Sequence, residues 1–296
     1  MALSTIIIDI NELNTDDSIQ EFVENTGFNV CVLSPATNSD SMDNSSNEES
    51  IDVLNLDKID SIFLSESFVI TDNRNGASFA IENGIGMAIY TNGQNNPSEY
   101  TNALYCIDCL KEMTDGTLIR MFERANGIPW TITETDRCII REITVADVDR
   151  LYEIYSDPET KQYIEDLYTN KEDEIKYTEE YIANQYRFFE YGLWIVVDKS
   201  NNKIIGRAGL FNRENQYLIE LGFVFDKNYW GKGYASEVLT AVIDYAKSEL
   251  SVTSMCAHVH KDNVRSKKLL EKLGFVRTCE NIIDSKTYDQ DVLTIL

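Results

Sequence analysis

The pattern of apolar and polar positions divides the chain into two parts with different orders of elements. In the first part, apolar runs with many β-branched residues alternate with amphipathic stretches, and strands that alternate with helices are typical of a parallel sheet covered on both faces. We therefore expect a Rossmann-like α/β domain. The predicted strands are 5–10, 28–34, 67–71 and 84–92, and the predicted helices are 16–27 and 77–84.

The second part begins with one strand and one helix and continues with three consecutive strands, so it predicts an antiparallel meander in an α+β mixed sheet. Thr144 is the expected cap of the first helix. The strands are 137–143, 193–198, 203–211, 217–225 and 254–260, followed by a final strand pair, and the helices are 146–156, 235–250 and 263–274.

The segment Gly-Ile-Pro-Trp at 127–130 separates these two patterns, so we place domains at 1–130 and 131–296. Residues 34–50 contain no lysine or arginine and almost nothing apolar, which predicts a mobile loop inside the first domain.

Composition changes this picture mainly through charge, because the formal net charge is −24. Residues 1–130 carry 21 acidic against 5 basic residues, and residues 131–296 carry 29 against 21. Nucleic acid and anionic membrane surfaces are therefore not expected as partners. A cationic acceptor, such as an amine or a basic peptide, would be attracted, although the acidity would also serve solubility alone.

The six cysteines are scattered, and we find neither a secretory signal nor a membrane-spanning run, so reduced thiols in the cytoplasm are expected. Cys106 and Cys109 have the spacing of half a zinc site or a redox pair, or are simply small buried residues. His258 and His260 share one face of a strand, where packing or cleft lining is favoured over a metal. No metal is expected.

The segment YWGKGYASEV at 229–238 joins a predicted strand to a predicted helix and carries the clearest chemistry. A glycine-rich loop before a helix offers free backbone N–H groups and the positive end of the helix dipole, which suits a pyrophosphate. Lys232 adds a positive charge. The loop is not a dinucleotide fingerprint, because Ser236 replaces its third glycine, and it is not a P-loop.

This loop and the later segment NVRSKKLLEKLGF at 263–275 resemble the GNAT superfamily of acyl-coenzyme A-dependent N-acetyltransferases, in particular the branch with ribosomal-protein and spermidine acetyltransferases. Gly233 and Ala235 match the family's coenzyme loop, whereas Trp230 stands at its Arg/Gln position. The resemblance covers residues 137–296 and implies acetyl-CoA as cosubstrate. The implied coenzyme contacts are Phe223, Val224, Phe225, Trp230, Gly231, Lys232, Gly233, Tyr234, Ala235, Ser236, Asn263 and Ser266.

The resemblance also implies the residues that move protons. Glu220 is the expected general base, and the alternative is an acid on an exposed strand face. The tyrosine acid of many family members is replaced by Leu270, so Ser266 or a water would protonate the thiolate. Asn263 holds the pantetheine amide, caps its helix, or does both. The aromatic run 177–192 packs in the core or lines the acceptor pocket.

The first domain loosely resembles the haloacid dehalogenase-like fold, through Asp9-x-Asn11, Ser34 and Asp72 at strand ends. Asn11 cannot donate the proton that the phosphatase chemistry needs, so the resemblance implies a degenerate, non-catalytic domain. A plain flavodoxin-like domain is the alternative.

Together these features predict an enzyme that transfers an acetyl group from acetyl-CoA to a primary amine of a protein N-terminus, a polyamine or another small molecule. The alternative is an acyl-CoA-binding regulatory or scaffold protein whose transfer chemistry has lapsed. The sequence leaves the acceptor open and is compatible with an oligomer.

Overall fold

The computed structural model describes residues 2–10, 17–32, 64–100, 103–164, 166–213, 217–283 and 286–295. Two compact units make up the chain, Met1–Ile128 and Pro129–Leu296. The predicted loop 34–50 lies outside the described residues.

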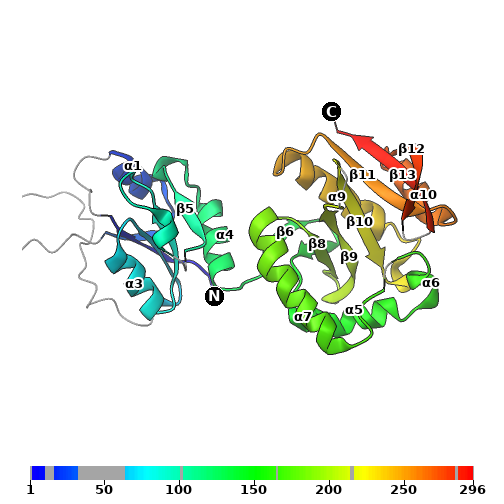
Figure 1. Cartoon of the computed structure of the whole chain (residues 1–296), viewed down its shortest axis with the longest axis horizontal. Coiled ribbons are helices and arrows are strands. Elements are labelled where there is room, and N and C mark those ends of the chain that lie inside the picture. Colours follow the sequence, from blue (N-terminus) through cyan, green and yellow to red (C-terminus); the bar gives the residue numbers. More distant parts are fainter. Residues whose placement is uncertain are drawn as a thin grey trace, which may run out of the picture. The chain divides into compact units, whose positions relative to one another are not determined.

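The first unit contains a five-stranded sheet in the order β2-β1-β3-β4-β5, and every neighbouring pair is parallel (Figure 1). The parallel sheet expected from the alternating pattern is therefore present, and β5 is an additional short edge strand. The strands are β1 Thr5–Asp9, β2 Asn29–Val32, β3 Ser67–Thr71, β4 Gly86–Tyr90 and β5 Tyr105–Ile107.

Helices cover both faces of this sheet. Ile6 and Ile8 of β1 pack in one cluster with residues of α1 and α4, while Ile7 points to the other face and packs near α3. This alternation follows from the two-residue period of a strand. The helices are α1 Asp17–Asn25, α3 Arg74–Glu82 and α4 Asp115–Ala125, with 3₁₀ turns η3 Pro97–Glu99 and η4 Leu110–Glu112.

The second unit is built on an eight-stranded sheet in the order β12-β13-β11-β10-β9-β8-β7-β6. The predicted meander is present, because β8, β9 and β10 pair antiparallel in turn. The short strand β6, which the sequence analysis missed, pairs with β7. The strands are β6 Thr131–Glu134, β7 Cys138–Arg141, β8 Leu193–Asp198, β9 Lys203–Phe211, β10 Ile219–Phe225, β11 Ser254–His260, β12 Val276–Ile283 and β13 Lys286–Thr294.

The longest helix, α9 Tyr234–Ser248, buries Val238, Leu239 and Val242 against one face of this sheet. On the other face, Ile154 and Tyr155 of α5 pack with Val224 of β10. The remaining elements are the 3₁₀ turn η5 Val145–Asp147, α5 Val148–Tyr155, α6 Pro158–Lys161, α7 Lys171–Tyr181, the π-helical segment η6 Ile182–Tyr186, α8 Arg187–Phe189, the 3₁₀ turn η7 Lys227–Tyr229 and α10 Val264–Lys272.

The junction of β10 and β11 positions the site. These two strands run parallel but pair only at Ile219–Met255 and Glu220–Cys256. Beyond that point they separate, so the edge of β10 at Phe223–Phe225 has no neighbouring strand on the side of β11. Backbone N–H and C=O groups on such an edge are available to a ligand.

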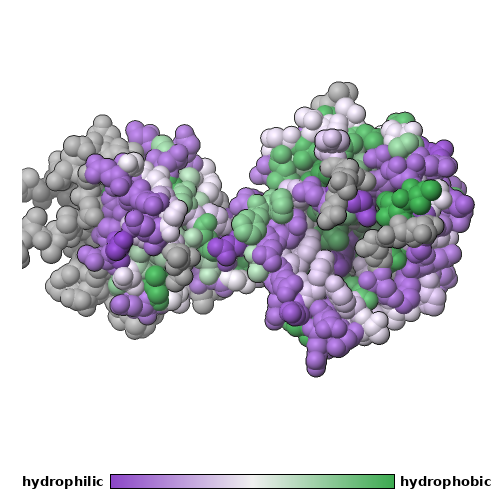
Figure 2. Space-filling model, in the orientation of Figure 1, coloured by the Kyte–Doolittle hydropathy of each residue, from purple (hydrophilic) through white to green (hydrophobic). Residues whose placement is uncertain are grey.

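The described surface is largely hydrophilic in the view of Figure 2, where apolar residues form separate patches. Across the described parts of the chain, every helix is too short or too polar to qualify as a membrane span.

Candidate active site

The glycine-rich loop leads directly into α9. Gly231 and Gly233 have φ angles of +71° and +84°, in the left-handed region that glycine adopts without a Cβ clash, and Gly233 is the N-cap of α9. The first N–H groups of the helix have no partner inside it. The loop therefore presents backbone donors at the positive end of the helix dipole.

Arg137 fixes the glycine-rich loop through three contacts. Its Nε lies 2.6 Å from Glu237 Oε2, its Nη1 donates to the Lys232 carbonyl at 3.0 Å, and its guanidinium lies 4.1 Å from the centre of the Tyr234 ring. The Tyr234 hydroxyl reaches Asp198 at 3.4 Å. These contacts fix the loop relative to the sheet, and Arg137, Glu237 and Asp198 in them were not predicted from the sequence.

Trp230, the residue that departs from the family's loop pattern, ties the loop to the end of β10. Its indole Nε1 donates to the Phe225 carbonyl at 2.8 Å, and the Arg265 guanidinium lies 3.9 Å from the ring centre. The indole thus places a cation beside the loop, where an arginine–aromatic contact is favourable.

A cavity of about 590 Å³ lies between this loop, β10 and the start of α10. Lys232 and Tyr234, which are also expected at the coenzyme, do not line this cavity. Tyr234 contacts Asp198 and Arg137, and the coenzyme contacts of both residues stay a prediction. All the other expected coenzyme residues line it: Phe223, Val224, Phe225, Trp230, Gly231, Gly233, Ala235, Ser236, Asn263 and Ser266.

Asn263 caps α10, since its Oδ1 accepts a hydrogen bond from the Ser266 backbone N–H at 3.1 Å. The capping alternative for Asn263 is therefore confirmed, and its contact with a pantetheine amide stays a prediction. Leu270, at the position of the family's tyrosine, is fully buried in the core. Its side chain offers no proton to the cavity.

A second cavity of about 700 Å³ opens on the face of the sheet opposite α9. It shares six lining residues with the first cavity, so the two meet side by side. Tyr177 and Tyr181 of the aromatic run line the second cavity, whereas the neighbouring Tyr186 is fully buried in the core. Core packing is therefore confirmed for Tyr186, and the role of the run in an acceptor pocket stays a prediction. The shared residues are Tyr163, Ile164, Phe223, Val224, Asn263 and Ser266.

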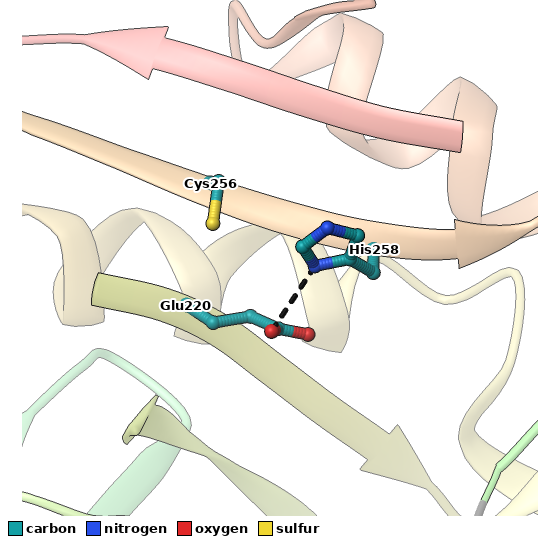
Figure 3. A group of neighbouring side chains, drawn as sticks. All are labelled: Glu220, Cys256 and His258. Atoms are coloured by element: carbon teal, nitrogen blue, oxygen red, sulfur yellow. Dashed lines mark ion pairs between the residues drawn. The ribbon is translucent and has the colours of Figure 1, made fainter. Parts of the chain in front are cut away.

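Glu220 on β10 and His258 on β11 meet in the wall of the second cavity, next to Cys256 (Figure 3). Glu220 Oε2 lies 3.1 Å from His258 Nδ1 and 2.8 Å from Arg213 Nε. Only 3% of Glu220 is exposed, so the alternative of an acid on an exposed strand face is wrong. Burial acts to raise the pKa of Glu220, but the hydrogen bonds from His258 and Arg213 outweigh it and lower this pKa.

Glu220, Cys256 and His258 also have the residue types of a metal site, with ligand atoms within 4.8 Å of one another. Two features oppose a divalent cation there. The Arg213 guanidinium contacts both carboxylate oxygens of Glu220, at 2.8 and 3.3 Å, and repels a second positive charge. Burial raises the pKa of the Cys256 thiol to about 11, so the thiolate ligand is disfavoured. The arrangement suits proton transfer better than metal binding.

Two acidic residues at strand ends of the first unit accept hydrogen bonds from asparagine side chains. Asp9 Oδ2 accepts from Asn73 Nδ2 at 3.1 Å, and Asp72 Oδ2 accepts from Asn92 Nδ2 at 3.0 Å. Burial raises the pKa of Asp9, although the hydrogen bond from Asn73 acts in the opposite direction. Asn11 and Ser34, the other residues of the expected phosphatase-like pattern, lie outside the described residues.

Comparison with known proteins agrees with the fold and the loop. Residues 137–276 match the acetyltransferase (GNAT) domain. The uncharacterized protein YkkB of Bacillus subtilis is 32% identical over 146 residues, which are 47% of this chain and 82% of that protein. The uncharacterized N-acetyltransferase p20 of Bacillus licheniformis is 29% identical, over 48% of this chain and 80% of the relative.

The [ribosomal protein uS5]-alanine N-acetyltransferase of Escherichia coli is 27% identical, over 52% of this chain and 83% of that enzyme. The chain belongs to the GNAT family of acetyltransferases. It is an acyltransferase that acts on an amine.

Proposed function

We propose that the protein transfers the acetyl group of acetyl-CoA to a primary amine that enters through the second cavity. The observation that carries this proposal is the meeting of the two cavities along Phe223, Val224, Asn263 and Ser266. The first cavity has the phosphate-binding loop and the free edge of β10, and the second has a buried carboxylate. A thioester in the first would thus lie beside an amine in the second.

Proton transfer is assigned to the residues at this junction. The acceptor ammonium gives a proton to the Glu220–His258 pair, and the free amine attacks the thioester carbonyl carbon. The C–S bond breaks, and the coenzyme thiolate leaves with the bonding electrons. Ser266, which lines both cavities, passes its hydroxyl proton to the thiolate and takes in return the second proton that the nitrogen loses as the amide forms. The first unit has no role in this chemistry and acts as a non-catalytic α/β domain.

Binding and turnover test the proposal separately. All three tryptophans, at positions 130, 194 and 230, belong to the second unit, so tryptophan fluorescence reports its unfolding alone. Acetyl-CoA should raise the unfolding midpoint of this signal, as any ligand of the folded state does. Thiol release should then follow with an amine panel that includes a polyamine and a peptide beginning with alanine.

The outcomes distinguish the two functions under consideration. Acetyl-CoA binding with thiol release on at least one amine supports the transferase. Binding without release on any amine would favour the acyl-CoA-binding regulatory protein. If acetyl-CoA leaves the midpoint unchanged, both assignments of the first cavity are wrong.

A further inference from the structure

The second cavity has a charge opposite to that of the whole chain. Among the described residues that line it, Glu220 is the only acid, and it is already paired with Arg213. Besides Arg213, the basic residues that line the cavity are Arg207, His258 and His260. The composition predicts a cationic acceptor, but the wall that an acceptor touches offers a surplus of positive charge.

Arg207 is the origin of this surplus. It lies in the middle of β9, opposite Val224 of β10 and Ile195 of β8, and only 8% of it is exposed. Its Nε is buried without a hydrogen-bond partner. Within the described part of the chain, no carboxylate lies within ion-pair distance of its guanidinium.

The groups around Arg207 are phenols rather than acids. Tyr155, Tyr177, Tyr181 and Tyr186 are the ionisable side chains that act on the pKa of Arg207, and the first three line the cavity with it. Arginine stays protonated in proteins, so these neutral neighbours leave its charge uncompensated. A buried cation without an anion is costly, and buried charges in proteins are normally paired with an opposite charge.

We propose that Arg207 binds an anionic group, most simply a carboxylate, on the acceptor whose amine is acetylated. The acceptor is therefore an amino acid or a peptide-like molecule that carries an acid besides its primary amine. The amine lies towards Glu220 and His258, and the acid lies towards the guanidinium fork, which matches a carboxylate with two parallel N–H donors. This inference rests on the proposed acetyl transfer.

Matched pairs of acceptors test the assignment. The panel contains straight-chain ω-amino acids of increasing length and the ω-amino carboxamides of the same lengths, which differ only in the charge of the distal group. At the best length, the acid should exceed the amide in kcat/KM by about tenfold or more, because a hydrogen bond to a charged group is stronger than one to a neutral group. Equal rates in every pair would overturn the assignment while leaving the acetyl transfer intact.

Variants test whether Arg207 causes the preference for acids over amides. Arg207→Gln should erase the preference, so that the acid and the amide of each length give the same kcat/KM. Arg207→Lys should retain part of the preference, because the charge stays and the two parallel N–H donors are lost. Lys203→Gln, which removes the same charge from an exposed position of the same strand, should keep the full preference. A preference that survives Arg207→Gln would contradict the proposal.

A binding measurement covers the case in which turnover is absent. Among N-acetylated ω-amino acids of increasing length, at least one should raise the tryptophan-fluorescence midpoint of the unmodified protein and not that of Arg207→Gln. The N-acetylated amide of the same length should raise neither midpoint by as much. Without ligand, Arg207→Gln should keep or raise the midpoint, since it removes an uncompensated buried charge. A lower midpoint together with an equal loss of activity on acids and amides would show that Arg207 is structural.

Discussion

The Glu220 carboxylate lies 3.1 Å from Nδ1 of His258, and the two residues come from neighbouring parallel strands that separate just beyond this contact. The pair therefore stands where β10 and β11 part, in the wall that an acceptor amine would meet. A carboxylate with a lowered pKa stays ionised and orients the imidazole. The proposed proton acceptance is therefore assigned to the pair and not to Glu220 alone.

Glu220→Gln should lower kcat by about 10²- to 10⁴-fold, the usual contribution of a positioned general base. Acetyl-CoA affinity should change little, because Glu220 does not line the first cavity. Glu179→Gln, an exposed acid on α7, is the matched control. Thiol-release kinetics and fluorescence titration measure the two quantities. An unchanged kcat would eliminate Glu220 from the reaction.

His258→Gln should reduce kcat to a similar extent, and the double variant Glu220→Gln/His258→Gln should lose no more than the larger single effect. Residues that act as a unit give such non-additive losses. A double-mutant cycle on kcat measures the coupling. If the two losses multiply, the residues act independently and the pair is not the base.

Ser266→Ala should lower kcat by roughly 10- to 100-fold if the hydroxyl protonates the departing thiolate. The cap of α10 should survive, because Asn263 binds the backbone N–H of Ser266 and not its side chain. Helix content and acetyl-CoA affinity are the controls. A rate equal to that of the unmodified protein would assign the proton to water.

Gly231→Ala should weaken acetyl-CoA binding, since an L-residue at a φ of +71° costs roughly 1–2 kcal/mol and its Cβ stands where the phosphates approach. No protein atom within 4 Å would meet that Cβ, so packing does not contribute. Gly93→Ala is the matched control, because Gly93 has a φ of +78°, equally open surroundings and a place in the first unit. If both variants bind acetyl-CoA equally well, the loop does not hold the phosphates.

The lowered pKa of Glu220 predicts a stability change in acid. A carboxyl whose folded pKa lies below its ordinary value of 4.5 stabilises the fold above that pH, and the contribution is lost as the pH falls through the folded pKa. The gap in unfolding free energy between the unmodified protein and Glu220→Gln should therefore be full at neutral pH and shrink below about pH 4.5. Urea titrations followed by tryptophan fluorescence measure it. A gap that is independent of pH would contradict the ion pairs of Glu220.

Sequence patterns predicted most of the second unit because its signals are local. Three strands in succession and a glycine pair before an amphipathic stretch leave few alternative folds. Strand β6 was missed because its four residues, Thr131–Glu134, have no apolar run of their own and gain their place by pairing with β7. The hydrogen bond from Arg137 to the Lys232 carbonyl could not be predicted, because motifs give positions along the chain and not the contacts between residues far apart in sequence.

The charge of the second cavity could not be predicted, because a net charge averages over the whole chain. Within KIIGRAGLF, nothing in the sequence shows that the arginine at position 207 is nearly buried or that phenols surround it. Those facts depend on contacts between β9, α5 and α7, which are far apart in sequence. The same holds for Arg265, which reaches Trp230 only after α10 packs beside the loop.

The separation of β10 and β11 also bears on solubility. An unpaired strand edge is a template for association with another chain, and proteins usually cover such edges. At Phe223–Phe225 the protein's own strands leave the edge open towards the first cavity. A bound pantetheine arm would cover that edge. Coenzyme binding should therefore lower the tendency of the protein to aggregate.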